Sequence, residues 1–321
     1  MSKTADAIRE TAARLLRDGR VALVLGYEAG SVPFKTAPAF IRRAEEAERL
    51  VWGPFCTNNL AVYLPKLKNA GRIAIVAKGC DARSTVTLIQ EHQILREQVV
   101  IIGVHCSGMV DADRLAPDGS LAGIAIVTEA DGRLTVESGD GRRTVALGDL
   151  VQERCRVCEH NTPPVADEIV GDPVPSMPGA ASPFAAVKDL ERLSVAERQA
   201  FWRAQVERCL RCYACREACP ACYCRTCFVD KAAPRWLSKA STVDDNWMFH
   251  AVRAFHLAGR CVECGECERA CPMDIPISTL NRMLDREVRE RFGYVAGLDP
   301  EAVPPLGTFR PDDPDPGGHG G

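Results

Sequence analysis

The sequence contains 16 cysteines in 321 residues, and eight of them form two copies of one motif. In each copy, gaps of two, two and three residues separate four cysteines, and a proline follows the last one. The copies are Cys209, Cys212, Cys215 and Cys219 with Pro220, and Cys261, Cys264, Cys267 and Cys271 with Pro272. Three thiolates so spaced can wrap a tight loop around one face of a cubane and bind one iron each. The motif therefore predicts two 4Fe–4S clusters.

The fourth cysteine of each copy lies beyond this loop, where the chain turns away at the proline. In two-cluster ferredoxins this cysteine binds the cluster of the other motif. We therefore expect Cys209, Cys212, Cys215 and Cys271 to bind the first cluster, and Cys261, Cys264, Cys267 and Cys219 to bind the second. The alternative is a pair of zinc sites. Zinc, however, prefers two cysteine pairs set well apart to three tight spacings followed by proline.

Four further cysteines can form a third site. Cys80 and Cys106 each follow directly on a predicted parallel strand. Because open α/β sheets place ligands at the carboxyl ends of such strands, the two thiols could face one another. The pair Cys155 and Cys158 could then complete a set of four ligands. The alternative is that Cys80 and Cys106 are small buried residues and that the pair is incidental.

The last four cysteines are Cys56 and the group Cys222, Cys224 and Cys227, which overlaps the end of the first motif. Three close thiolates could bind an extra metal, with Cys56 as a fourth ligand from the other part of the chain. The alternative, which we favour, is that these are buried thiols that stiffen a loop near the cluster.

Elements of an α/β unit must position the third site. Apolar periodicity predicts helices over 4–18, 36–50, 58–68 and 82–95, and apolar runs predict strands at 21–25, 72–77 and 99–104. The order strand, helix, strand implies a right-handed crossover and a parallel sheet. Alternating segments at 121–128, 134–137 and 144–147, separated by turn residues, predict an antiparallel flap after this unit.

Helices are expected around the two cysteine motifs. Ser194 and Glu197 form a capping box that starts a helix leading into the first motif, and further helices are predicted over 244–257 and 278–291. We interpret His250, in the first of these, as a packing residue. The predicted organisation is an α/β domain over 1–160, a proline-rich linker over 161–190, a mainly helical two-cluster ferredoxin domain over 191–293 and a disordered tail over 294–321.

Composition excludes several classes of protein. With 46% hydrophobic and 26% charged residues the chain can bury a sizeable core, and its net charge of −3 argues against nucleic acid as the main partner. The longest apolar stretches are too short to span a bilayer, and the N-terminus has no apolar signal-peptide core. We therefore expect a cytoplasmic protein, whose clustered cysteines bind metal rather than form disulfides.

Part of the chain resembles a known family. The segments 77–85 and 101–111, the Cys155–Cys158 pair, and the segments 164–167 and 170–172 resemble the beta subunits of coenzyme F420 hydrogenases and dehydrogenases, which include formate dehydrogenase beta subunits. The resemblance spans roughly 50–175. It implies that this domain exchanges electrons with a deazaflavin through FAD and an iron–sulfur cluster, and that Cys80, Cys106, Cys155 and Cys158 bind a third 4Fe–4S cluster. The region 209–277 resembles the helical ferredoxin domains of multi-subunit oxidoreductases.

No GxGxxG fingerprint marks a dinucleotide site. Since the resemblance places FAD in the α/β domain, the candidate contacts are Thr57, Asn58, Asn59, Lys78 and Gly79. The first three open a predicted helix, whose N–H groups suit phosphate, while Lys78 could pair with pyrophosphate and Gly79 allows close backbone approach. The alternatives are a purely structural helix cap and a surface charge at Lys78.

These features predict an iron–sulfur flavoprotein that transfers electrons within a cytoplasmic oxidoreductase complex of the hydrogenase, formate dehydrogenase or heterodisulfide-reductase type. It would move electrons between a two-electron carrier at FAD and 4Fe–4S clusters. Expected partners are catalytic or electron-accepting subunits, with a deazaflavin or nicotinamide coenzyme as the two-electron carrier. The alternative is a flavin-free polyferredoxin adaptor whose α/β domain only docks partner proteins.

Overall fold

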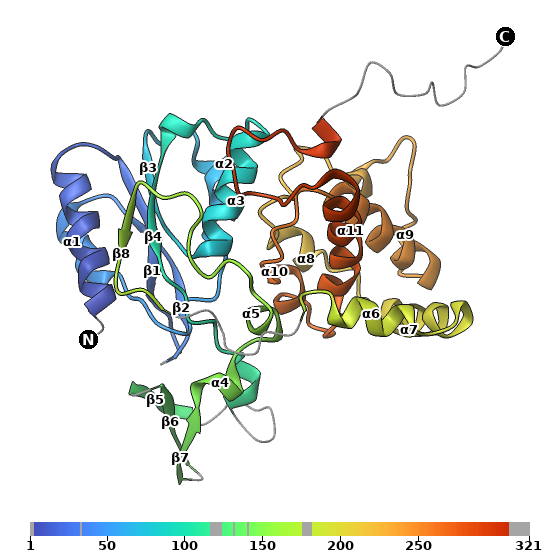
Figure 1. Cartoon of the computed structure of the whole chain (residues 1–321), viewed down its shortest axis with the longest axis horizontal. Coiled ribbons are helices and arrows are strands. Elements are labelled where there is room, and N and C mark those ends of the chain that lie inside the picture. The colour runs from blue at the N-terminus through green and yellow to red at the C-terminus, as the bar shows by residue number, and fades with distance from the viewer. Residues whose placement is uncertain are drawn as a thin grey trace.

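The computed structural model describes residues 3–32, 34–115, 124–130, 132–139, 141–174 and 182–307. Figure 1 shows an α/β part beside a helical part, with a small three-stranded sheet projecting from the α/β part. In the ranges described, no helix is both long and apolar enough to cross a membrane.

A five-stranded sheet forms the centre of the α/β part. Its strands are β1 (Leu23–Ala29), β2 (Thr36–Ile41), β3 (Ile73–Ala77), β4 (Val99–Val104) and β8 (Glu168–Val170), in the order β2-β1-β3-β4-β8. β1, β3, β4 and β8 run parallel, and β2 is antiparallel to β1. The predicted parallel sheet is therefore present, with a mixed edge.

Helices cover both faces of this sheet. Side chains of α1 (Lys3–Arg17) pack with alternate residues of β1, β3 and β4 on one face, and α3 (Gly79–Gln90) packs with the other set. Every residue of β3 and β4 is buried, which explains their continuous apolar runs. The carboxyl ends of β3 and β4 therefore emerge together at one edge, with Cys80 and Cys106 just beyond them.

The helix predicted over 36–50 is wrong. The segment forms β2 and then a 3₁₀ helix, η1 (Ala44–Arg49). Pro38 lies within β2 opposite Tyr27. Proline has no N–H to donate to a neighbouring strand, and this is tolerated because β2 is an edge strand. Over 58–68 the chain forms only a 3₁₀ turn, η2 (Leu60–Tyr63), and a short helix, α2 (Leu64–Leu67), so the predicted helix is shorter and starts later.

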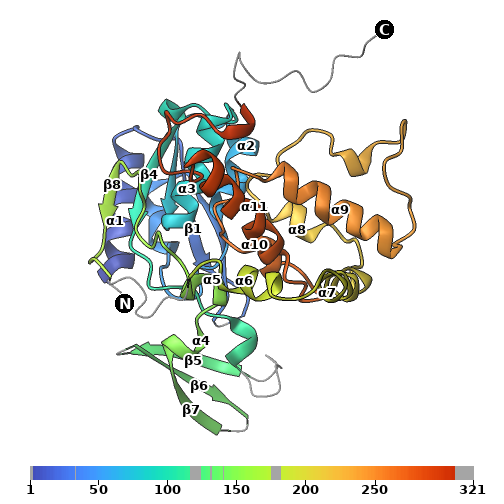
Figure 2. The same cartoon turned by 45° about the vertical axis from the view of Figure 1, so that its right-hand side comes forward.

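The predicted flap is confirmed in the described residues. β5 (Ile124–Ala130), β6 (Arg133–Ser138) and β7 (Gly141–Ala146) form an antiparallel sheet that projects away from the other elements in Figures 1 and 2. Residues 121–123 of the first predicted strand lie outside the described residues. Two short helices, α4 (Leu147–Leu150) and α5 (Glu153–Arg156), then return the chain to the edge of the main sheet.

The predicted linker over 161–190 contains ordered structure. It contributes β8 to the sheet, where the Asp167 carboxylate accepts a hydrogen bond of 2.7 Å from the Ile101 N–H. It also contributes α6 (Ala185–Glu191). The proline pattern indicated an extended segment, but pairing with β4 makes part of it a strand.

The helical part contains the elements that carry the two cysteine motifs. They are α7 (Val195–Glu207), α8 (Ala214–Glu217), α9 (Val243–His256), α10 (Glu266–Arg269) and α11 (Ile277–Phe292). Of the remaining 3₁₀ turns, η3 (Arg96–Gln98) and η4 (Ala112–Leu115) precede these helices, η5 (Phe228–Asp230) lies between α8 and α9, and η6 (Pro305–Gly307) follows α11. The capping box at Ser194 is confirmed, since the Glu197 N–H donates to Ser194 Oγ and the Ser194 N–H donates to Glu197 Oε2. The helices predicted over 244–257 and 278–291 are confirmed as α9 and α11.

The predicted disordered tail is ordered over 294–307, while 308–321 lie outside the described residues. Figures 1 and 2 show the red segment after α11 returning to α3. There the Arg83 Nε donates to the Ala296 carbonyl (3.0 Å), and the Gln90 amide donates to the Ala302 carbonyl (2.9 Å). Side chains of α3 thus donate hydrogen bonds to backbone carbonyls of this segment that no helix or strand there satisfies.

Gly297 makes this docking possible and provides a test of it. Its φ is +75°, and a Cβ there would lie 2.2 Å from the Arg83 carbonyl oxygen. We expect Gly297→Ala to destabilise the protein by about 1–2 kcal/mol, because an L side chain disfavours left-handed backbone, with the clash adding to this cost. Urea unfolding and limited proteolysis would measure it. Gly307→Ala, where a Cβ has no neighbour closer than 3.8 Å, is the control. Equal stability of both variants would contradict the docking.

Candidate functional site

The twelve predicted ligand cysteines gather in three groups of four around three separate cavities. The first cavity is lined by Cys209, Cys212, Cys215 and Cys271, the second by Cys219, Cys261, Cys264 and Cys267, and the third by Cys80, Cys106, Cys155 and Cys158. These groups equal the three expected ligand sets, including the exchange of Cys219 and Cys271 between the motifs. Binding of a cluster in each cavity stays a prediction.

The other four cysteines do not form a fourth set of four ligands around one cavity. Cys222, Cys224 and Cys227 line a further cavity of about 1150 Å³ together with Cys219. Cys56 lies in the core of the α/β part, with its Sγ 3.9 Å from the Val51 carbonyl oxygen. Within the described ranges, no three His, Cys, Asp or Glu side chains are placed to hold a single metal ion.

The two motifs have the same backbone conformation, which explains how they form matching loops. Arg211 and Tyr213 in the first motif, and Glu263 and Gly265 in the second, have φ between 51° and 68°. Left-handed residues that alternate with other conformations turn successive backbone N–H groups into a loop, where they can face an anion. The Arg211 N–H accordingly points at Cys209 Sγ, 3.3 Å away. After each loop a short helix, α8 or α10, carries the third cysteine.

His250 contacts a predicted ligand of the first cluster, so it is more than the packing residue expected from the sequence. Its Nε2 lies 3.3 Å from Cys209 Sγ. Burial lowers the pKa of His250 to about 4, and repulsion from Arg253 adds to the shift. The ring is therefore neutral at neutral pH, and its Nε2-protonated tautomer donates a hydrogen bond to a thiolate. His250 and Cys209 are 41 positions apart, so no local sequence pattern indicated this contact.

Burial keeps four of the thiols that line the cavities neutral unless a cation binds them. Burial raises the pKa of Cys215 to about 11 and that of Cys106, Cys264 and Cys267 to about 12. Only thiolates bind iron, and a bound metal ion stabilises the thiolate directly. A bound metal would therefore have to supply the charge that ionises these thiols.

Arg253 on α9 is a buried cation whose surroundings are consistent with anionic clusters nearby. Its side chain is buried, and the Nη2 donates to the Cys215 carbonyl (3.0 Å), while its buried Nε has no hydrogen-bond partner. Among the described residues it has no carboxylate partner, and the charged groups acting on it most strongly are cysteines. Because an unpaired buried cation is costly, four-thiolate clusters on either side would supply the missing counter-charge.

The second and third cavities are neighbours. Arg154, which lies next to Cys155, packs against the second motif so closely that a Cβ on Gly265 would be 2.1 Å from Arg154 Cδ. Its guanidinium forms a buried ion pair of 3.5 Å with Glu266 on α10. Thiolates from both cavities, Cys80 and Cys264 among them, raise the pKa of Arg154 although burial opposes its charge.

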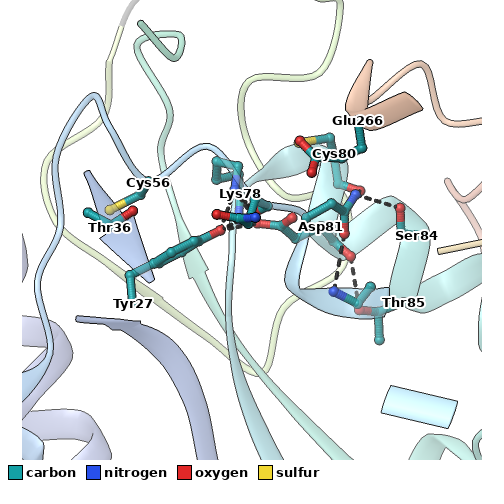
Figure 3. Close-up of polar contacts among 12 residues, drawn as sticks. Tyr27, Thr36, Cys56, Lys78, Cys80, Asp81, Ser84, Thr85 and Glu266 are labelled. Atoms are coloured by element: carbon teal, nitrogen blue, oxygen red, sulfur yellow. Dashed lines mark hydrogen bonds and ion pairs between the residues drawn. The ribbon is translucent and has the colours of Figure 1, made fainter. Parts of the chain in front are cut away.

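A buried lysine stands beside the third cavity (Figure 3). The Lys78 ammonium pairs with Asp81 at 2.8 Å, and both side chains are at most 1% exposed. It also donates to the Asn58 carbonyl (2.9 Å) and to the hydroxyl of Tyr27, which itself donates to the same carbonyl (2.6 Å). Burial opposes the charge on Lys78, but the Asp81 carboxylate raises its pKa and keeps it a cation. The interpretation of Lys78 as a surface charge is therefore wrong.

The other candidate flavin contacts also have partners within the protein. The Asn59 amide donates to Ser84 Oγ (2.9 Å), and its oxygen accepts from the Ala61 N–H (3.1 Å). A Cβ on Gly79 would lie 1.8 Å from the His160 carbonyl oxygen, so this glycine allows close approach of protein backbone. Thr57 lies next to Asn58 in the same loop, where its N–H donates to the Phe55 carbonyl. Flavin contact at these residues stays a prediction.

Comparison with known proteins gives two matches. Residues 70–192 match the family described as the C terminus of the coenzyme F420 hydrogenase/dehydrogenase beta subunit, and residues 205–275 match the 4Fe-4S dicluster domain. The chain thus contains a region similar to the F420 hydrogenase/dehydrogenase beta subunit, here called the beta-subunit domain, followed by a region similar to the dicluster domain. This confirms the resemblance seen in the sequence, and the second match supports iron–sulfur clusters in the dicluster domain.

Relatives extend over most of the chain. The F420-dependent formate dehydrogenase subunit beta of Methanocaldococcus jannaschii is 24% identical, with 88% of this chain and 89% of that protein covered. The F420-dependent formate dehydrogenase 1 subunit beta of Methanococcus maripaludis is 26% identical, with 92% of each covered. A chain of the F420-reducing [NiFe] hydrogenase complex from Methanosarcina barkeri matches at 17% identity with a TM-score of 0.36, over 47% of this chain and 58% of that one.

The Lys78–Asp81 pair in the beta-subunit domain can be tested by its effect on stability. We expect Lys78→Met to destabilise the protein by about 3–5 kcal/mol, because Asp81 would stay buried without its partner. Adding Asp81→Asn should recover part of that loss. Urea unfolding followed by circular dichroism measures both, with the exposed Lys66→Met as control. A Lys78→Met variant as stable as the control would show that this pair does not support the fold.

Proposed function

We propose that this chain is an electron-transfer subunit of an F420-dependent oxidoreductase complex, in which three 4Fe–4S clusters pass single electrons through the protein. The observation that carries the proposal is the set of three four-cysteine cavities. The names of the relatives, F420-dependent formate dehydrogenase beta subunits, support the reaction class. Formate dehydrogenase is accordingly the complex that the comparisons favour.

The cavities lie in series, which supports a route from the beta-subunit domain to the far end of the dicluster domain. Arg154 lies between the third and second cavities and touches both. Arg253 donates to the Cys215 carbonyl at the first cavity, and its charge acts on Cys219 and Cys267 of the second. Electrons would therefore pass between the third and first clusters through the second.

The first cluster is the proposed point of contact with another protein of the complex. Cys212 is the exposed member of its ligand set, whereas the second and third sets contain no exposed cysteine. Leu210 in the same loop is 62% exposed, and Trp247 on α9 is 41% exposed. Exposed apolar side chains beside a redox centre suit a docking surface for another protein.

FAD and a deazaflavin coenzyme complete the proposal at the opposite end, near the third cluster. A flavin can exchange two electrons with a carrier and pass them on singly, as clusters require. FAD is supported by the family resemblance, and F420 by the relatives' names. Thr57 and Asn58 are the candidate contacts in this domain.

A second candidate function is a flavin-free adaptor that carries electrons through clusters alone. The observation that favours it is that Lys78, Asn59 and Gly79 are all occupied by internal contacts. The two functions differ in flavin content and share the three clusters.

Cofactor content tests both candidates. Protein purified under argon should hold about twelve irons, because three cubanes hold four each. One FAD per chain, detected by its visible spectrum after release from denatured protein, is expected for the first function, and none for the second. Four irons or fewer in protein with intact cysteines, or stoichiometric zinc, would contradict both.

The exchange of ligands between motifs has its own test. Because Cys271 lines the first cavity, Cys271→Ser should alter the EPR signal of the first cluster and leave that of the second largely intact. Cys219→Ser should do the reverse. Cys215→Ser and Cys267→Ser are matched references, one for each cluster. If Cys271→Ser instead changed the signal that Cys267→Ser changes, each motif would bind its own cluster.

A further inference from the structure

Arg253 stands out among the basic residues of the dicluster domain. Neighbouring arginines form ion pairs, such as Arg260 with Glu91, Arg282 with Glu263 and Arg286 with Glu191. Arg253 is 4% exposed and, in the part of the chain that the structure describes, has no such partner. Its Nε is buried without any hydrogen bond.

The surroundings of Arg253 come from two cavities. On one side its Nη2 donates to the carbonyl of Cys215, a residue of the first cavity. On the other side its charge acts on Cys219 and Cys267, which line the second cavity. The guanidinium therefore has cysteine neighbours from both predicted cluster sites, and it also lines the large cavity, where it contacts the Cys222 thiol.

We propose that Arg253 is the shared counter-charge of the first and second clusters and that it sets the reduction potentials of both. The inference rests on the proposed function, since it requires both clusters to be bound. Arg253 is no ligand, and it acts through charge.

The direction of the effect follows from electrostatics. Reduction adds one negative charge to a four-thiolate cluster, and a fixed cation nearby stabilises that charge more than it stabilises the oxidised state. Net charge and hydrogen bonding around the cluster are among the properties that set its potential. Water screens this interaction little because the guanidinium is buried. Arg253 should thus raise both potentials and favour electron transfer from the third cluster into the dicluster domain.

Replacement of the charge in the full-length protein tests the proposal. In Arg253→Met we expect the equilibrium constant for one-electron reduction of the first and second clusters to fall at least tenfold, which corresponds to about 59 mV per cluster. Arg253→Lys, which keeps the charge, should stay much closer to the unmodified protein. The potential of the third cluster should change least. Redox-titrated EPR of each variant, with iron content measured in parallel, gives these values.

Arg286→Met is the matched control, because Arg286 is also an arginine of the dicluster domain but is paired with Glu191. Its potentials should equal those of the unmodified protein. The proposal is overturned if Arg253→Met binds both clusters with unchanged potentials, if only one of the two shifts, or if the control shifts them equally. Should Arg253→Met fail to bind clusters, Arg253→Lys decides: a tenfold fall in the reduction equilibrium constants of both clusters there would also overturn the proposal.

An unmodified protein that holds no clusters would instead refute the proposed function. The iron content of the unmodified protein therefore separates the two failures. Potentials that move with the charge at residue 253 in a protein with intact clusters would support the proposal, because a merely structural role would not distinguish lysine from methionine in this way.

Discussion

The contact between the α/β part and the dicluster domain decides how the third cysteine cavity lies relative to the other two. Buried polar groups make this contact. Arg83 on α3 donates to the carbonyls of Ala296 and Val262, and Arg154 pairs with Glu266. Glu91 joins α3 to Arg260, whose Nη2 lies 2.8 Å from the carboxylate. Because such groups are costly to bury without their partners, the two parts are held in one arrangement.

This arrangement explains why arginines lie beside the cavities. Thiolate-bound clusters would be anionic, and positive charge near two such clusters would lower the repulsion between them. Arg154 and Arg253 each have cysteine neighbours from two cavities. Protein stability and the proposed electron route would thus depend on the same pair of charges.

The third cavity shows how the sheet itself builds a site. β3 and β4 are parallel neighbours, so the residues just beyond their carboxyl ends meet at one edge. Lys78 lies at that same edge, inside the protein. Its ammonium forms an ion pair with Asp81 and donates a hydrogen bond to the Tyr27 hydroxyl. The lysine therefore supports the loop next to the thiols of Cys80 and Cys106, and its charge acts on both of them.

The amino-acid sequence by itself determined the features that depend on short-range spacing. Both cysteine motifs, the capping box at Ser194 and the parallel strands β3 and β4 follow from local pattern. Motif spacing led to the first two four-cysteine groups, whereas strand order left the third open and the family resemblance implied it. It did not determine β2, where pairing with β1 outweighed a helical pattern, or the ordered tail, whose partners lie on α3.

Only the tertiary structure revealed His250 and Arg253 as neighbours of predicted ligands, and Lys78 as a buried ion pair. Each depends on a partner brought near by folding. The physical reason is that ligand spacing is a property of one loop, whereas the charge and hydrogen bonds around a site come from segments far apart in the chain.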